Sequence, residues 1–265
     1  MLAIDIGNTN VSLGAFRGKR LARTFSFPTQ ACRSATGLVR RLRRHRAAIA
    51  GGEQAILCSV VPWATPKVAR ALRAMGVKQI RVVGRDVKVP LKNRYRYPRQ
   101  VGQDRLVGAY AAWKEFKRDC IICDFGTAVT IDVVKATRSG KDRSPLATRH
   151  SPLLWGEYLG GVIAPGLEIS LEALASRTAL LPKVELKEPP ELLGRDTANS
   201  IRSGVLYGCV ALCDGLVAGL KRQYAPKAVV VATGGASPLL AKHTRCIDHL
   251  RPNLVLDGLL QLSRL

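Results

Sequence analysis

A short strand–turn–strand pattern occurs twice in this chain, and it limits the possible folds more than any other feature. The first copy, DIGN at 5–8, joins apolar strands at 2–6 and 11–16. The second copy, DFGT at 124–127, is flanked by apolar strands in the same way, 119 residues further on in a chain of 265. A supersecondary unit repeated at about half the chain length predicts an internal duplication of two similar α/β domains.

Hydrophobic periodicity places further elements around each copy. In the first half we expect a strand at 21–27, an Arg-rich helix, a strand at 55–61, a helix at 65–75 and a strand at 79–83. In the second half we expect a strand at 158–163, helices at 167–176 and 197–224, a strand at 228–232 and two more helices. We therefore predict an α/β fold of two duplicated domains, residues 1–115 and 116–265, each with a mixed sheet flanked by helices.

The two turns suit phosphate binding. Gly7 and Gly126 allow a tight turn in which backbone N–H groups approach an anion. Asp5 and Asp124 can hold the cations that neutralise phosphate. An ordinary polar hairpin with an Asx turn is the alternative interpretation of a single copy. Two copies favour the phosphate site.

Two other nucleotide-binding signatures are absent from the sequence. The sequence has no GxxxxGK[ST] motif, and no GxGxxG opens a helix after the first strand. A third glycine element, Thr233-Gly234-Gly235, directly follows the strand at 228–232. Such glycines let a backbone lie flat against a nucleotide, although glycines also simply end strands.

The charge balance is strongly basic, with 42 Lys and Arg against 19 Asp and Glu and a formal net charge of +23. Such a charge attracts acidic ligands, nucleic acid or anionic lipid. The arginines at 40–46 follow a helix all the way round, which is typical of a solvated helix. The basic stretch at 92–99 interleaves Tyr95 and Tyr97, but no DNA- or RNA-binding motif accompanies it, so nucleic acid is not a predicted partner.

The seven cysteines and the amino-terminal residues indicate where in the cell the protein is expected. The number is odd and the spacing fits no disulfide framework. Asp5 precedes any possible signal-peptide h-region, and no apolar run reaches the roughly 18–20 residues of a membrane helix. We expect a soluble cytoplasmic protein with no membrane partner.

A zinc site can be imagined from four of these cysteines. They are Cys120, Cys123, Cys209 and Cys213. The first two enclose two isoleucines in an apparent buried strand, where cysteine behaves as a small apolar residue. We therefore do not predict zinc.

Taken together, the motifs resemble the superfamily of acetate and sugar kinases, heat-shock chaperones and actin. More narrowly, they resemble type III pantothenate kinases through DIGNTN at 5–10, GQDR at 102–105, DFGTAVTID at 124–132, GGVIAPG at 160–166, SRTALLP at 176–182 and TGG at 233–235. The resemblance implies two actin-like (ribonuclease H-like) domains with an ATP cleft between them. It also implies phosphorylation of pantothenate to 4′-phosphopantothenate, the first step of coenzyme A synthesis.

A hydroxyl nucleophile needs a positioned carboxylate to accept its proton. Asp104, at the start of an amphipathic helix, is the best candidate from the residues alone, with helix capping as the alternative. The resemblance implies that Asp104 is the general base. It implies pantothenate contacts at Tyr95, Gly102, Gln103, Asp104, Arg105 and Thr178. In the family that threonine comes from the neighbouring subunit, which implies a homodimer whose dimerisation helices lie in the second domain.

The resemblance also assigns the nucleotide and cation sites. The ATP contacts are Asp5, Ile6, Gly7, Asn8, Thr9, Asn10, Val11, Ser12 and Thr127, to which the third glycine element adds Gly234 and Gly235. Magnesium accompanies ATP, bound through water to Asp5, and Asp124 binds an activating monovalent cation, potassium or ammonium.

Three departures from the family pattern stand out. Gln103 replaces the usual Ala, Tyr97 replaces the usual Asn before the proline, and residues 135–155 look like a basic insertion in a hairpin loop. Two other functions stay open. One is phosphorylation of a different small molecule by the same fold, which would need another acceptor pocket. The other is a non-catalytic transcription accessory factor, for which steep salt-dependent DNA binding would be the sign.

Overall fold

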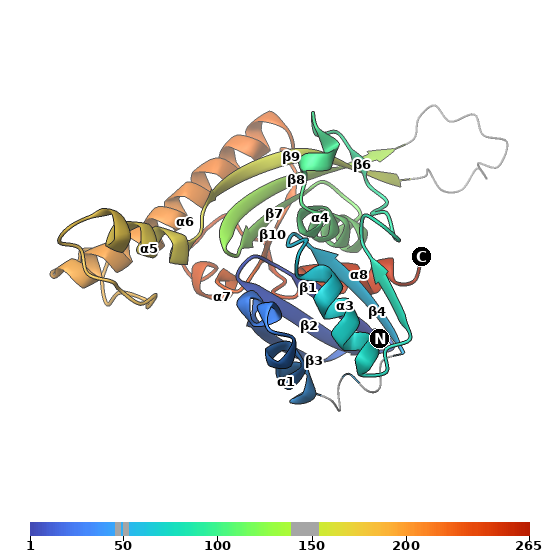
Figure 1. The fold of residues 1–265 in the computed structure, drawn as a ribbon. Coiled ribbons are helices and arrows are strands. Elements are labelled where there is room, and N and C mark those ends of the chain that lie inside the picture. Colours follow the sequence, from blue (N-terminus) through green and yellow to red (C-terminus); the bar gives the residue numbers. More distant parts are fainter. Residues whose placement is uncertain (46–48, 50–52, 139–153) are drawn as a thin grey trace. The chain divides into compact units, whose positions relative to one another are not determined.

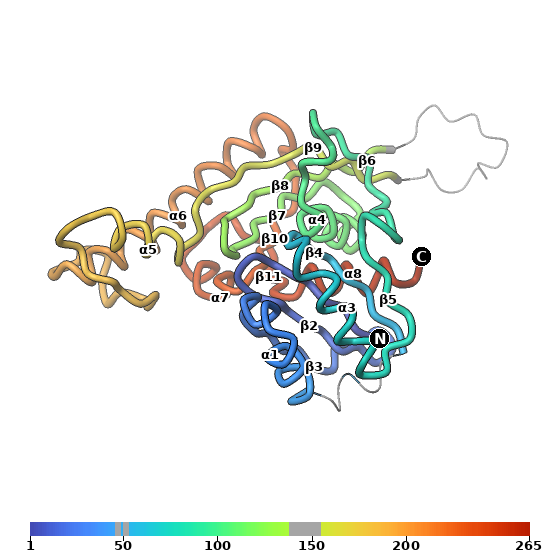
Figure 2. Tube along the Cα trace, viewed as in Figure 1, coloured from blue at the N-terminus to red at the C-terminus, as the bar shows by residue number. Residues whose placement is uncertain are grey.

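The computed structural model describes residues 1–45, 49, 53–138 and 154–265 (Figure 1). The chain forms two compact units. Unit 1 comprises Met1–Leu91, Arg96–Ala111 and Leu254–Leu265, and unit 2 comprises Lys92–Tyr95 and Ala112–Asn253. Figure 2 follows the chain through both. The change of unit at Ala111/Ala112 lies close to the predicted division after residue 115, which stays a prediction as a domain boundary.

Unit 1 is built on a five-stranded sheet in the order β3-β2-β1-β4-β5. Its strands are β1 (Leu2–Ile6), β2 (Asn10–Arg17), β3 (Arg20–Pro28), β4 (Gln54–Ser59) and β5 (Gln79–Val82). β1 pairs antiparallel with β2 and parallel with β4, so the carboxyl ends of β1 and β4 meet at one edge. The helices are η1 (Thr29–Arg33), α1 (Ala35–Arg43), α3 (Thr65–Ala74), η2 (Pro98–Gln100), α4 (Gln103–Phe116, whose last residues belong to unit 2) and α8 (Leu254–Leu262).

The core of unit 1 is formed by apolar residues that recur with the periodicity of a helix in α1 and of a strand in β1 and β2. In α1, Leu38 and Leu42 lie one turn apart and are buried, whereas Arg40 and Arg43 are exposed. Leu38 and Leu42 join the alternate apolar residues of β1 and β2 in one hydrophobic core. Arg40, Arg43 and Arg44 are exposed, as the sequence predicted, whereas Arg41 is half-buried and Arg46 lies outside the described residues.

Unit 2 is built on a six-stranded sheet in the order β11-β10-β7-β8-β9-β6. Its strands are β6 (Lys92–Asn93), β7 (Cys120–Phe125), β8 (Ala128–Arg138), β9 (Leu154–Pro165), β10 (Val229–Thr233) and β11 (His249–Leu250), and its helices are α5 (Leu167–Arg177), α6 (Thr197–Gln223) and α7 (Ser237–Leu240). β7 pairs antiparallel with β8 and parallel with β10. The hairpin and its parallel neighbour therefore repeat the arrangement of β1, β2 and β4, and the predicted α/β class with mixed sheets is confirmed.

The cysteines of unit 2 belong mainly to its core. Cys120 and Cys123 are both buried in β7, but an odd spacing points them to opposite faces of the sheet. The Sγ of Cys213 lies 3.8 Å from that of Cys123 and 3.9 Å from that of Cys246. Among the described residues no group of three or more His, Cys, Asp or Glu is arranged to hold a metal ion.

The two-residue strands β6 and β11 were missed, since they are too short for a periodic signal. The expected insertion at 135–155 falls largely on residues 139–153, which lie outside the described part; β8 ends at Arg138 and β9 begins at Leu154.

Helix α6 bears on the expectation that no segment is long and apolar enough to be a membrane helix. It is long and apolar enough to span a membrane by length and composition, although no uninterrupted apolar run of that length exists in it. About a third of its most apolar stretch is buried in the protein. Core helices of soluble proteins meet the same test, so this single helix is weak support for a membrane span.

Candidate active site

The first predicted phosphate turn joins β1 to β2 and is fixed by three hydrogen bonds. The Gly7 N–H donates to Asn10 O at 3.0 Å, and the Thr29 N–H donates to Thr9 O at 2.8 Å. The Thr29 hydroxyl donates to Gly7 O at 2.6 Å. Buried Ile6 and the strand after it anchor the turn, while its tip is exposed. Backbone N–H groups and polar side chains are thus held where an anion can reach them.

Thr29 was not predicted as a site residue. It is 1% exposed and begins η1 directly after β3. The available signal was the pairing of β2 with β3, which sets Asn10 opposite Pro28 and so places the next residue beside the turn.

Asp5 and Asp104 lie near one another in unit 1. In the parallel pairing of β1 with β4, Asp5 is opposite Cys58. Burial raises the pKa of the Cys58 thiol well above its usual range, and the nearby carboxylates of Asp5 and then Asp104 raise this pKa further. Both carboxylates therefore lie close enough to the same buried thiol to act on it electrostatically. This brings the candidate base to the sheet edge that carries the phosphate turn.

The GQDR segment contains Gly102, directly before α4, and the first three residues of that helix. Asp104 is half-buried, and its Oδ1 accepts the Arg105 N–H at 2.8 Å. A Cβ on Gly102 would collide with that same oxygen, so only glycine leaves Asp104 in this position. The carboxylate at the start of the helix is also favoured by the helix dipole, which means that capping and catalysis are compatible roles.

Gln103, the departure from the family pattern, packs onto a glycine of unit 1. Its side chain lies 3.0 Å from where a Cβ of Gly84 would be, and Gly84 has a φ of +87°. The longer side chain is therefore accommodated by a backbone position without a side chain.

The second turn and the third glycine element come together in unit 2. Asp124 and Thr233 are opposite one another at the carboxyl ends of β7 and β10. Gly234 has a φ of +89°, and a Cβ there would overlap Asp124 Oδ1 and lie 2.7 Å from the Phe125 carbonyl. Gly235 has nothing within 4 Å of its Cβ position. The loop thus covers the Asp124 carboxylate closely while leaving one glycine open.

Thr127 and the end of β9 are in equally close contact. Thr127 is exposed at the tip of the second turn, where the Gly126 N–H donates to Ala128 O at 3.2 Å. A Cβ on Gly166, directly after β9, would overlap Thr127 O and lie 2.6 Å from Gly126 O. Gly166 therefore has to be glycine, which explains the last residue of GGVIAPG.

The two remaining predicted substrate residues both belong to unit 2. Tyr95 follows β6 and is half-buried. Thr178 follows α5, is exposed, and its hydroxyl donates to Leu174 O at 2.7 Å. In Figure 1, α5 and β6 lie at opposite ends of this unit. The structure therefore does not bring Thr178 to Tyr95 of the same chain.

With this geometry in view, comparison with known proteins gives a consistent result. The family model of type III pantothenate kinases matches residues 1–140 and 155–219. The chain belongs to the type III pantothenate kinase family. Type III pantothenate kinases of Moorella thermoacetica and Anaeromyxobacter dehalogenans are 35% and 38% identical to it, and each alignment covers 98% of this chain and 96% of the relative.

The match to the type III pantothenate kinase family leaves out residues 141–154, where the sequence predicted an insertion. Among solved structures, a protein described as a Baf family transcriptional activator from Campylobacter jejuni aligns with a TM-score of 0.58 at 16% identity, covering 100% of this chain and 98% of the other. The ethanolamine utilization protein EutJ from Carboxydothermus hydrogenoformans aligns with a TM-score of 0.52 at 12% identity, covering 98% and 89%. These two likenesses concern the fold.

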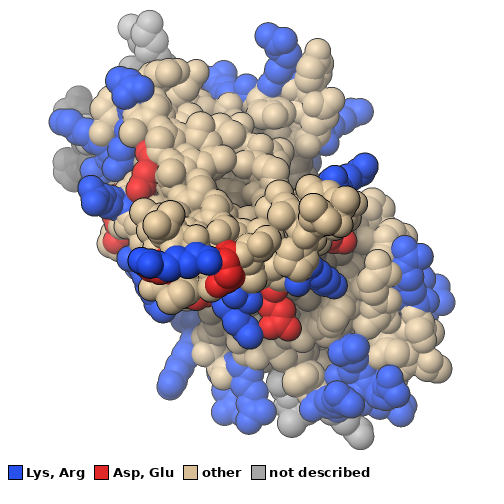
Figure 3. All heavy atoms as spheres, turned by 90° about the vertical axis from the view of Figure 1, so that its left-hand side faces the viewer, with Lys and Arg blue, Asp and Glu red and all other residues tan. Residues whose placement is uncertain are grey.

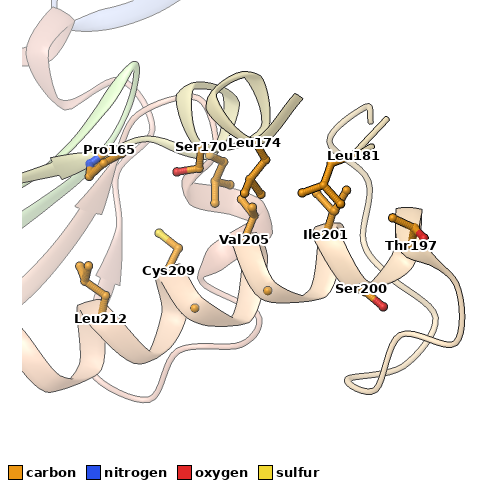
Figure 4. Close-up of a pocket in the computed structure, with 13 residues that line it drawn as sticks. Pro165, Ser170, Leu174, Leu181, Thr197, Ser200, Ile201, Val205, Cys209 and Leu212 are labelled. Carbon is orange, nitrogen blue, oxygen red and sulfur yellow. The ribbon is translucent and has the colours of Figure 1, made fainter. Parts of the chain in front are cut away.

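A pocket in this pantothenate kinase family member lies along α5 and α6, and its lining includes Pro165, which is opposite Ala128 beside the second turn (Figure 4). It has a volume of about 520 Å³ and is lined by apolar and small side chains, among them Leu174, Leu181, Gly208 and Leu212. Thr178 lies between the first two of these in sequence. The pocket has too few polar groups to bind ATP, and it is considered below as a surface for a second copy of the chain.

Proposed function

We propose that this chain transfers the γ-phosphoryl group of ATP to the primary hydroxyl of pantothenate, giving 4′-phosphopantothenate in the first step of coenzyme A synthesis. Family membership supports the reaction. The structural arrangement that supports it best is found at the carboxyl ends of β1 and β4. Asp5 is opposite Cys58, and Gly102, whose Cβ would meet the Asp104 carboxylate, lies against Val60 directly after β4. A candidate base and a candidate phosphate turn in the same unit fit phosphoryl transfer.

In this proposal Asp104 accepts the proton of the pantothenate hydroxyl as that oxygen attacks the γ-phosphorus. Gly102 keeps the carboxylate in place, and Arg105 and Gln103 contact the substrate from the same helical turn. The turn at 5–12 binds the phosphates through its N–H groups and polar side chains, and Thr29 keeps this turn in shape. Phosphoryl transfer needs mainly such positioning and charge neutralisation.

Two cations complete the proposal. Magnesium would neutralise the ATP phosphates, bound through water near Asp5, whose carboxylate is half-buried at the end of β1. A monovalent cation would bind Asp124, and the oxygen-rich surroundings there fit such an ion, because the Phe125 carbonyl and the Thr233 side chain lie at the same strand ends. Thr127, Gly234 and Gly235 are the proposed nucleotide contacts of unit 2.

The basic surface suits anionic substrates. Helices η1, α1 and α3 carry seven Lys and Arg residues and no Asp or Glu. On the face shown in Figure 3, blue Lys and Arg side chains clearly outnumber red Asp and Glu. ATP and pantothenate are both anions, so a positive field raises their local concentration. We propose a cytoplasmic location for the enzyme.

The test is phosphorylation of pantothenate by the purified protein, with potassium compared with sodium and with acetate and hexoses as alternative acceptors. Potassium-stimulated 4′-phosphopantothenate is the expected product. Transfer to another acceptor alone would replace pantothenate as the substrate. Absence of any transfer, combined with steep salt-dependent DNA binding, would favour the transcription accessory factor.

We also propose that the active enzyme is a homodimer with a shared active site. Helix α5, which precedes Thr178, and strand β6, which precedes Tyr95, lie at opposite ends of unit 2 (Figure 1), and the pocket between α5 and α6 is apolar and open (Figure 4). Leu180 is 91% exposed, which is unfavourable for an isolated subunit. A second copy packed on this face would cover these apolar groups and supply Thr178 to the partner's site.

Complementation tests this arrangement. Asp104→Asn and Thr178→Ala chains, each impaired alone, are mixed and allowed to exchange subunits. A mixed dimer then contains one intact site if Asp104 and Thr178 come from different chains, so activity should return. No recovery, or a monomeric mass in solution, would contradict the shared site. Gly208→Arg should break the dimer, because Gly208 lines the pocket, whereas the exposed and distant Gln223→Arg should not.

A further inference from the structure

The segment that carries Tyr95 is tied to strand β9 by its backbone. Lys92 and Asn93 pair in parallel with Glu157 and Tyr158. The Arg94 N–H then donates to Tyr158 O at 2.8 Å. The Tyr95 N–H donates to the Asn93 side-chain oxygen at 3.0 Å. The position of Tyr95 therefore depends on the local shape of β9.

That shape is set by a β-bulge. Val133 is opposite Gly160 but Val134 is opposite Tyr158, so β9 contains one extra residue here. Gly160 has a φ of +129°, and its Cβ position would be 3.2 Å from Cδ2 of the Tyr95 ring. The ring of Tyr95 thus lies directly against the backbone of Gly160, and any side chain at this residue would push it away.

The Tyr95 ring also lies near Tyr158, which forms a buried hydrogen-bonded pair with Asp132. Tyr158 is fully buried, and its ring centroid lies 6.5 Å from that of Tyr95. Its hydroxyl donates a hydrogen bond of 2.7 Å to Asp132 Oδ1, and Asp132 is only 2% exposed. Gly161 makes room for this pair, because a Cβ there would collide with the same Asp132 oxygen. The two adjacent glycines therefore leave space for different side chains: Gly160 for the ring of Tyr95, and Gly161 for the carboxylate of Asp132.

Burying a carboxylate in a sheet is costly, and an apolar pair of similar size would fill the same space at lower cost. What the Tyr158–Asp132 hydrogen bond adds is a single orientation for the Tyr158 ring, and hence for the Tyr95 ring packed on it. Neither Tyr158 nor Asp132 was among the site residues predicted from the sequence.

We propose that Tyr158 and Asp132 are positioning residues, which fix Tyr95 at the bulge of β9 and thereby set the affinity for pantothenate without taking part in phosphoryl transfer. This inference rests on the proposed function and on the substrate role of Tyr95. It predicts that disturbing the pair changes pantothenate binding and leaves ATP binding and the chemical step unchanged.

The first experiment compares kinetic constants of Tyr158→Phe and Gly160→Ala with the wild type, after circular dichroism has shown that the variants are folded. We expect KM for pantothenate to rise about tenfold, equivalent to roughly 1.4 kcal/mol, with kcat and KM for ATP little changed. Gly76→Ala is the matched control for backbone strain, because Gly76 has a φ of +94° but nothing within 4 Å of its Cβ position. It should leave KM for pantothenate unchanged.

A double-mutant cycle separates positioning from a general loss of stability. In a Tyr95→Ala background, Tyr158→Phe should have no further effect on KM for pantothenate, because the ring it positions is absent. An unchanged KM in Tyr158→Phe, or full additivity in the cycle, would overturn the inference while leaving the proposed function intact.

A second measurement does not depend on activity. Nitration of Tyr95 by tetranitromethane, located by peptide mass spectrometry, should become faster in Tyr158→Phe and Gly160→Ala and stay unchanged in Gly76→Ala. If the wild type does not phosphorylate pantothenate, the proposed function fails, and this measurement still decides whether the pair holds the ring. Equal nitration rates in all four proteins would overturn the positioning role.

Discussion

Replacing Thr29 by valine tests whether one buried hydroxyl holds the first phosphate turn. Valine keeps the branched shape of threonine but has a methyl group in place of the hydroxyl, so the change removes the hydrogen bond to Gly7 O. Because Thr29 is 1% exposed, the carbonyl loses a donor that water cannot easily replace. A buried polar group left without its partner costs about 1–3 kcal/mol. For a protein of this size the unfolding midpoint should fall by about 2–4 °C per kcal/mol.

The same change should weaken ATP binding, because the turn is no longer held at Gly7. Thermal unfolding and KM for ATP are measured together, with Thr29→Ser as the control that keeps the hydroxyl and removes only a methyl group. We expect the valine variant to show a lower midpoint and a higher KM for ATP than the serine variant. A valine variant equal to wild type in both quantities would refute the role of Thr29 in shaping the turn.

Three further predictions follow from the site. Asp104→Asn should lower kcat by about 10²–10⁴-fold in a folded protein, as the loss of a general base does, and near-normal turnover would exclude this role. Gly234→Ala should unfold at lower temperature and lose stimulation by potassium, because its Cβ would overlap Asp124, whereas Gly76→Ala, at a similar positive φ but with nothing within 4 Å of its Cβ position, should keep that stimulation. The Asn199 N–H bound to Asp196 lowers the pKa of Asp196 at the start of α6; its stabilisation is therefore present above the unfolded pKa of about 4 and lost below it, so Asp196→Asn should lose less stability than wild type in acid. Parallel acid-unfolding curves for the two proteins would contradict the last prediction.

Much of the fold could be predicted because each long element has a strong local signal. The run of four apolar residues before each DxG turn, and Leu38 and Leu42 one turn apart in an Arg-rich helix, can each be interpreted without tertiary information. Strand β6 could not be predicted, since two residues, Lys92 and Asn93, have no period. Its pairing depends on β9, which is more than sixty residues further along the chain.

Some residues of the candidate site could be predicted from the sequence and others could not. Asp5, Asp104 and Asp124 each lie within a recognisable sequence motif. Their assigned roles stay proposals. Thr29 has no motif of its own, because its importance arises from the register of β2 with β3. The Tyr158–Asp132 pair was missed for a related reason: a tyrosine and an aspartate 26 residues apart become partners only through strand pairing and a bulge.

The segment Leu254–Leu265 has a consequence for how the protein is made. It belongs to unit 1, where Leu256 lies against Gly14 of β2 and Gly258 lies against Val107 of α4. The unit that carries the first phosphate turn is therefore completed by residues synthesised after all of unit 2. On the ribosome, unit 1 has to wait with an uncovered apolar sheet face until these residues emerge, which exposes it to misfolding and aggregation during synthesis. For the same reason, a fusion that disturbs helix α8 should destabilise strands at the opposite end of the sequence, β1 and β2, which flank the first predicted phosphate turn.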